Sequence, residues 1–274
     1  MSVLGVFAHP DDESLAAGGF LARESEAGKR TAVVTATWAE GTARARDLAD
    51  ALRILGAEAP RFLGHADDRV PDSSPGRARL VATPLDETVR LLVEQIRDFR
   101  PEVIVTHDRY GGLTGHPDHL HTYRVTLLAA QAAGSVGLYP DSGPPWRPSS
   151  LYLATHPHSV LPRLREAFGD RRSVHTVPDE HVSFRLEVSP WLDTKLAAIA
   201  AHRTEVARSA ARGDRRAGSA RPSRCAGRRV LHRRQRGARA AVMLDVAQRA
   251  SSGAGGSALS MTTLARLRGA HAAR

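Results

Sequence analysis

The motif Ala8-His9-Pro10-Asp11-Asp12-Glu13 directly follows the apolar run Val3-Leu4-Gly5-Val6-Phe7 near the start of the chain. The apolar run predicts a buried strand, and the residues after the motif predict a helix over 14–28. A histidine and two aspartates therefore lie on a tight turn at the carboxyl end of a first strand. In open α/β sheets, ligands bind at this edge.

A second polar cluster, Gly115-His116-Pro117-Asp118-His119, follows another apolar run, Val103-Ile104-Val105-Thr106. Either cluster alone also fits helix capping or a polar loop. Their joint occurrence, each after a predicted strand, favours a functional site instead. Together they supply enough nitrogen and oxygen donors for a divalent metal.

The spacing within each cluster brings its side chains together. His9 and Asp12 can converge on one point of the turn, whereas Asp11 faces the neighbouring space. A separation of three residues at a helix start puts the rings of His116 and His119 on one side. Two histidines and one carboxylate with an open position are typical of catalytic zinc, which lowers the pKa of bound water to about 7. Non-haem Fe²⁺ uses the same donors and stays an alternative to Zn²⁺. The spare carboxylate of Asp11 favours hydrolysis, because it can serve as general base.

Short apolar runs alternate with helical periodicity along residues 1–206. Strands are predicted at 3–7, 31–37, 61–63, 103–106 and 151–154, with helices between them. The pattern predicts an α/β fold with a mostly parallel sheet, right-handed crossovers and helices on both faces. Segments 64–83 and 139–149 are rich in Pro, Gly, Ser and Asp, and are predicted to be loops.

Charge divides the chain of 274 residues, whose net charge is +10, into two parts. Residues 207–274 hold sixteen Arg and two acids, a balance of +14, whereas residues 1–206 carry −4. The second part has no aromatic residue and can bury little apolar surface. We expect it to be a mostly disordered basic tail, with short helices near 238–250 and 259–267. Without aromatic residues for base stacking it predicts no specific nucleic-acid binding.

The remaining composition is that of an ordinary globular domain. The single Cys225 excludes an internal disulfide, so a metal site must be built from His and carboxylates. We find no secretory leader and no apolar run of the roughly twenty residues that span a bilayer, which predicts a cytoplasmic protein without a membrane span. Homo-oligomer formation stays open.

The two histidine motifs resemble those of the PIG-L (LmbE-like) family of zinc-dependent N-deacetylases and amidases. The similarity continues from residue 1 to about 205 and includes Glu40-Gly41, Phe62-Leu63-Gly64 and Thr106-His107-Asp108. It implies a Rossmann-like deacetylase domain over 1–206, with zinc bound by His9, Asp12 and His119. It further implies that Asp11 is the general base and that His116, oriented by Asp118, stabilises the oxyanion or protonates the leaving amine. Family substrates are N-acetylglucosamine units in larger conjugates, which implies a small amino-sugar substrate here.

Two features depart from the family. Mycothiol-pathway members have a Tyr just before the Gly-His of the second motif, where this chain has Thr114. Glu205 replaces a Gln after the late helix predicted at Ser189–His202, and the expected C-terminal elements do not follow.

The leading hypothesis is hydrolysis of an acetamide on an amino sugar. The alternatives are an amidase acting on a thiol conjugate, an inactive metal- or sugar-binding remnant and, last, a nucleic-acid-binding protein.

Four further residues on loops or helix starts after strands are candidates for contacting sugar hydroxyls, although each also suits a structural role. They are Arg44, Asp67, Asp68 and Asp108. Five other histidines are predicted to be surface or loop residues: His65, His156, His158, His175 and His181.

Overall fold

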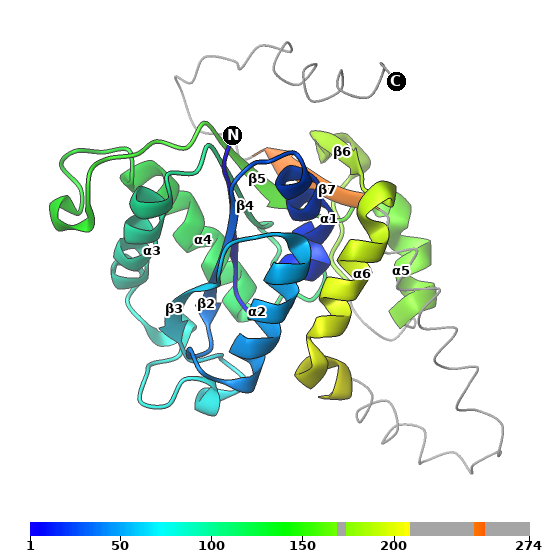
Figure 1. Ribbon diagram of the computed structural model, residues 1–274, viewed down its shortest axis with the longest axis horizontal. Coiled ribbons are helices and arrows are strands. Elements are labelled where there is room, and N and C mark those ends of the chain that lie inside the picture. Colours follow the sequence, from blue (N-terminus) through cyan, green and yellow to red (C-terminus); the bar gives the residue numbers. More distant parts are fainter. Residues whose placement is uncertain (169–173, 209–243, 250–274) are drawn as a thin grey trace.

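The computed structural model describes residues 1–168, 174–208 and 244–249 (Figure 1). A sheet with the strand order β3-β2-β1-β4-β5-β7-β6 forms its centre. Strands β1 to β5 run parallel to one another, and β7 is antiparallel to both of its neighbours. The strands are β1 (Val3–Phe7), β2 (Thr31–Thr37), β3 (Arg61–His65), β4 (Val103–His107), β5 (Ser150–Ala154), β6 (Phe184–Glu187) and β7 (Leu244–Arg249).

Helices cover both faces of this sheet, which confirms the predicted α/β architecture (Figure 1). On one face lie α1 (Asp12–Glu26), α2 (Ala43–Leu55) and α6 (Leu192–Ala201). On the other lie α3 (Leu85–Phe99) and α4 (Pro117–Ala132). The short helix α5 (Leu161–Phe168) follows β5.

Strand β1 is buried on both faces because its side chains alternate between two cores. Leu4 and Val6 pack with α3 and α4, whereas Val3 and Phe7 pack with α1, α2 and α6. All four side chains are fully buried. A continuous apolar run is what a central parallel strand requires.

The sheet reverses its winding direction at β1. The chain goes from β1 outward to β2 and β3, then returns to β4 on the other side of β1. Val3 and Val6 of β1 pair with Val103 and Thr106 of β4. The two histidine motifs follow these adjacent strands, so they meet at the switch point where open α/β sheets bind ligands.

Several boundaries differ from those predicted. Helix α1 begins at Asp12, two residues before the predicted start, so that Asp12 and Glu13 lie in its first turn. The predicted loops contain short 3₁₀ turns: Pro71–Ser73 and Leu80–Ala82 in the first, and Pro140–Ser142 in the second. The late helix starts with another 3₁₀ turn, Ser189–Trp191, before α6.

One prediction in the basic tail is wrong. The segment Leu244–Arg249, inside the helix predicted near 238–250, is the strand β7 between β5 and β6. Alanine content favoured a helix locally, but the open edge of β5 offers backbone hydrogen-bond partners that a strand can use. The helix predicted near 259–267 lies outside the described residues. Within the described residues, no helix is both long enough and apolar enough to span a membrane.

Candidate active site

The turn after β1 presents the first motif. The backbone N–H of Ala8 donates a hydrogen bond to His107 Nε2 at 3.1 Å. The backbone N–H of His9 donates one to Asp12 Oδ2 at 2.8 Å. Asp11 precedes α1 with φ 128° and ψ −27°, a conformation that non-glycine residues rarely adopt. Its carboxylate makes no capping hydrogen bond to the helix, which leaves it available for other contacts.

Three donor atoms from the two motifs form a compact triangle. His9 Nδ1 lies 3.1 Å from His119 Nε2 and 3.4 Å from Asp12 Oδ2, and the latter two atoms are 3.3 Å apart. Tetrahedral zinc with bonds of about 2.0–2.1 Å separates its ligand atoms by about 3.3 Å. His9 and Asp12 are buried and His119 is partly exposed, and the three donors fit three corners of a tetrahedral metal site. Because both His119 and Asp11 are partly exposed, a fourth position would face solvent.

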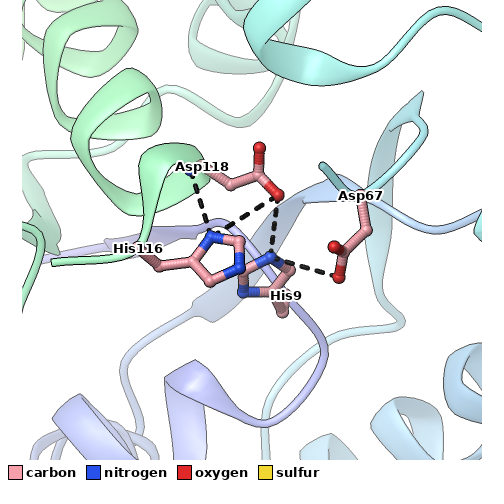
Figure 2. Close-up of side chains that lie close together, drawn as sticks. All are labelled: His9, Asp67, His116 and Asp118. Carbon is pink, nitrogen blue, oxygen red and sulfur yellow. Dashed lines mark hydrogen bonds and ion pairs between the residues drawn. The ribbon is translucent and has the colours of Figure 1, made fainter. Parts of the chain in front are cut away.

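The opposite side of the His9 ring faces two carboxylates, as Figure 2 shows. His9 Nε2 lies 3.0 Å from Asp118 Oδ2 and 3.4 Å from Asp67 Oδ2. Burial disfavours the charged imidazole, but Asp118, Asp12 and Asp67 outweigh burial and raise the pKa of His9 to about 10. The pocket therefore stabilises positive charge, as a cation site must. A carboxylate that accepts Nε2–H also leaves Nδ1 free to bind a metal.

His116 is the N-cap residue of α4, and its ring contacts that of His9 edge to face with a centroid separation of 4.6 Å. Its Nδ1 accepts the backbone N–H of Asp118 at 3.2 Å. Burial and the neighbouring charge of His9 lower the pKa of His116 to about 4. The imidazole is therefore neutral near pH 7, and its proton resides on Nε2 because Nδ1 is an acceptor.

Asp118 is fully buried, and its carboxylate contacts a different histidine from the predicted one. Its Oδ2 is 3.0 Å from His9 Nε2 but 3.7 Å from His116 Nδ1, and it also accepts the backbone N–H of Asp68 at 3.0 Å. Since His116 Nδ1 already accepts a backbone N–H, it has no proton to donate to this carboxylate. The carboxylate of Asp118 orients His9, whereas its backbone amide orients His116.

Asp11 lies beside a buried arginine. Arg44 Nη2 is 3.1 Å from Asp11 Oδ2, and the same guanidinium bonds to the Pro10 carbonyl oxygen. Burial and the charge of Asp12 raise the pKa of Asp11 to about 7, against the lowering effects of Arg44 and His9. A carboxylate with such a pKa can both take and return a proton at neutral pH.

The four candidates for sugar contacts differ in how many contacts their side chains already make within the protein. Asp108 is buried: its Oδ1 accepts the N–H groups of Tyr110 and Gly112, both at 2.9 Å, and its Oδ2 accepts the Thr155 hydroxyl at 2.7 Å. These contacts favour the structural role for Asp108, as those with Pro10 and Asp11 do for Arg44. Asp67 is buried against His9, and the carboxylate of Asp68 stays partly exposed.

Sequence reasoning missed three residues of the site. His107 stacks on His119 with a centroid separation of 4.0 Å, and its Nε2 lies 3.4 Å from Asp12 Oδ2. Its place directly at the end of β4 was the available signal. Glu13 and His202 are buried behind Asp11 and form an ion pair at 2.8 Å. Nothing local in the sequence indicates this pair, whose members are 189 residues apart.

Among the other histidines, His65 is the exception to the prediction of surface or loop positions. It ends β3 and is 2% exposed, with its ring nitrogens 3.3 Å and 3.4 Å from the Thr83 and Thr88 hydroxyls. Burial lowers its pKa. His158, His175 and His181 are exposed, and His156 is half-buried.

Comparison with known proteins identifies the family of this chain. Residues 4–130 match the family described as PIG-L, GlcNAc-PI de-N-acetylase. A Rhodococcus jostii protein named 1D-myo-inositol 2-acetamido-2-deoxy-alpha-D-glucopyranoside deacetylase is 36% identical over 239 residues, covering 74% of this chain and 81% of that protein. The chain belongs to the PIG-L family. A Mycobacterium leprae relative of the same name is 34% identical, and the matched region covers 74% of this PIG-L chain and 80% of the relative.

Solved structures support the fold of this PIG-L family member. A conserved protein of Thermus thermophilus is 27% identical with a TM-score of 0.52, covering 73% of this chain and 78% of that one. The N,N'-diacetylchitobiose deacetylase of Pyrococcus horikoshii is 18% identical with a TM-score of 0.54, covering 74% and 69%. The resemblance inferred from the two histidine motifs is thus confirmed, as is the prediction of a hydrolytic N-deacetylase of the α/β class.

Proposed function

We propose that this chain is a zinc-dependent hydrolase that removes the acetyl group from an N-acetylglucosamine-type conjugate. The observation that carries the proposal is the triangle of His9, Asp12 and His119 donors beside a carboxylate with a raised pKa. Relatives that share about a third of its residues are named as deacetylases of an N-acetylglucosamine unit joined to inositol. We therefore propose a sugar acetamide linked to a polyol as the substrate class.

The donor set favours zinc, since two imidazoles and one carboxylate with an open position are typical of catalytic zinc sites. When bound, the metal would polarise the acetyl carbonyl and lower the pKa of a water molecule. His9, Asp12 and His119 would hold it, and Asp118 would fix the tautomer of His9 through Nε2–H. Fe²⁺ could use the same donors.

Two side chains would move or hold protons during the reaction. Asp11 would take a proton from the attacking water and, with its raised pKa, return that proton to the leaving amine. His116, neutral with its proton on Nε2, would donate a hydrogen bond to the oxygen that becomes negative in the transition state. A neutral imidazole whose pKa is about 4 suits this role better than that of general acid.

The substrate site would lie where His119 and Asp11 reach solvent. Among the sugar-contact candidates we favour Asp68, because its carboxylate is partly exposed and its backbone N–H is fixed by Asp118. Arg44, Asp67 and Asp108 would act mainly by shaping the walls of the site.

We further propose that residues 1–206 form the deacetylase domain and that 207–274 are a basic tail, whose residues 244–249 add strand β7 to the sheet of that domain. The relatives cover about three quarters of this chain, which is the share that residues 1–206 make up. The residues proposed for metal binding and proton transfer all precede 207.

The direct test is release of free amine from a panel of acetamides, run with metal-free protein and with added zinc. The panel holds the inositol-linked N-acetylglucosaminide, free N-acetylglucosamine, N,N'-diacetylchitobiose and an N-acetylated thiol conjugate. We expect zinc-dependent amine release, fastest from the inositol-linked sugar. Preference for the thiol conjugate would support the amidase alternative. No release from any compound by zinc-loaded protein would favour the inactive remnant.

Replacing His119 with Ala should remove most of the bound metal. The variant leaves two donors where the site needs three, so zinc affinity should fall by at least about 100-fold. Zinc content after dialysis, measured by mass spectrometry, tests this. His181→Ala is the matched control, because that histidine is exposed and far along the chain from both motifs. Stoichiometric zinc in His119→Ala would refute the ligand assignment.

Zinc binding at pH 8 should release close to one proton per site from His9, in addition to the proton that a zinc-bound water loses. In the metal-free protein the pKa of His9 is about 10, so its ring is protonated at pH 8 and must lose a proton to bind metal. Calorimetry in buffers of different ionisation enthalpy measures this number. It should decrease as pH rises through 10. In Asp118→Asn, which weakens the carboxylate cluster, release at pH 8 should be smaller. Equal release by both proteins would contradict the role of Asp118.

A further inference from the structure

Four consecutive residues after α6 reach back to the first two helices of the chain. Each side chain of this segment, which we name the 202–205 clasp, pairs with at least one charged residue of these helices. The pairs are His202 with Glu13 at 2.8 Å, Arg203 with Asp50 at 2.6 Å, Thr204 Oγ1 with Asp47 at 2.7 Å and Glu205 with Arg44 at 3.4 Å. Two of these partners, Glu13 and Arg44, in turn contact Asp11.

The first connection runs through Glu13. Its Oε1 accepts His202 Nε2–H, and its Oε2 accepts the backbone N–H of Asp11 at 3.0 Å. Glu13 is fully buried and His202 is 2% exposed. A carboxylate buried this deeply stays in place only while it is paired. The Ser14 hydroxyl donates a hydrogen bond to Oε1 at 2.5 Å and His202 supplies the ion pair, so His202 helps to hold Glu13 where it can bond to Asp11.

The hydrogen bond from Asp11 N–H to Glu13 lies at a strained point of the backbone. The φ of 128° at Asp11 is a backbone conformation that L-residues rarely adopt. Such a conformation is kept only where contacts from the surrounding structure stabilise it. The Glu13 carboxylate fixes the Asp11 N–H, and Arg44 fixes the preceding carbonyl of Pro10. The turn is therefore held from both ends.

The second connection runs through Arg44. Its guanidinium is 6% exposed, packs over Trp38 with 4.8 Å to the ring centroid, and lies between Asp11 and Glu205. Nη1 faces Glu205 and Nη2 faces Asp11, so the two carboxylates occupy different edges of one planar group. Glu205, whose Oε2 also lies 2.7 Å from Arg208 Nη2, thereby constrains the angle at which Arg44 meets the Asp11 carboxylate.

We propose that His202 and Glu205 of the 202–205 clasp are positioning residues for Asp11, with His202 setting its backbone through Glu13 and Glu205 setting its carboxylate through Arg44. The proposal rests on the proposed function of Asp11 as general base. Neither residue touches the substrate; both act through a neighbour. Arg203 belongs to the same segment but pairs with Asp50 and Asp47, which carry no contact onward to Asp11 within the described residues.

The kinetic test compares three variants of the full chain. His202→Leu and Glu205→Ala should each lower kcat by about tenfold or more, because misplacing a proton-transfer group is costly, while KM stays within about twofold. His202→Gln can still donate to Glu13 and should restore most of kcat. Arg203→Ala, whose side chain is 68% exposed, is the matched control and should leave both constants unchanged. All variants should bind stoichiometric zinc.

A double-mutant comparison separates positioning of Asp11 from general loss of structure. In an Asp11→Asn background, adding His202→Leu should lower the residual kcat by less than about twofold, since both changes act on one group. Full additivity would overturn the proposal. Equal effects of Glu205→Ala and Arg203→Ala would also overturn it, and this comparison holds even where His202→Leu folds poorly.

Amide hydrogen exchange gives a readout that does not depend on turnover. The Asp11 N–H should be protected in the parent protein and in Arg203→Ala, and should exchange at least about tenfold faster in His202→Leu. Unchanged exchange would refute the first connection even in an inactive protein. Absence of amine release with normal protection would instead refute the proposed function and leave the clasp geometry intact.

Discussion

Replacing Asp11 with Asn should lower kcat by roughly 10³-fold while the protein keeps its full complement of zinc. The amide has nearly the same shape as the carboxylate, and Asn tolerates positive φ better than most residues. The backbone of the turn, the bond from Asp11 N–H to Glu13 and the donors of the metal site should therefore persist. What is lost is the ability to accept a proton from water.

The measurement is amine release under saturating substrate, together with zinc content. A suitable control is Asp98→Asn, which removes an acid of α3 whose side chain is 70% exposed and which pairs with Arg61. That variant should retain full activity. If Asp11→Asn were as active as the control with zinc bound, another group would have to be the base.

Replacing Arg97 with Met should produce the largest loss of stability, about 3–5 kcal/mol in the free energy of unfolding. Arg97 is 2% exposed and donates hydrogen bonds to carbonyl oxygens around the end of α4 and the loop after it. Its acceptors belong to Ala132, Ala133, Ser135, Leu138, Tyr139 and Gly143. Methionine fills similar volume but leaves these acceptors without their donor, and the carbonyl groups of Ala132 and Ala133 among them are buried.

Thermal unfolding measures the effect, and a shift of Tm by roughly 10 °C corresponds to that loss in a domain of this size. Arg90→Ala is the matched control on the same helix: Arg90 is 45% exposed and pairs with Glu94, a contact worth little. Arg97→Lys should recover only part of the loss, because a single ammonium cannot replace a planar fork. A Tm equal to that of Arg90→Ala would contradict this account.

The fold was predictable because the signals for it are local. The periodicity of α3 and the apolar runs of β1 and β4 determine their structure from residues near in sequence. The parallel sheet with helices on both faces followed from strand and helix alternation and the rule of right-handed crossovers. The exceptions are α5 and β6, where no element was predicted, and β7, where alanine content indicated a helix and pairing with β5 decided for a strand. Backbone partners on another element are invisible to a local pattern.

The candidate site divides in the same way. Local sequence was enough to identify the two histidine motifs, their positions after predicted strands, and the donor types available for a metal. Which atoms face one another depends on the tertiary structure. In the folded chain the Asp118 carboxylate contacts His9, and the Asp108 carboxylate accepts hydrogen bonds from loop amides. His202 pairs with Glu13, which is 189 residues away in the sequence. Contacts of this kind depend on distances of a few ångströms between distant segments, which spacing along the chain does not encode.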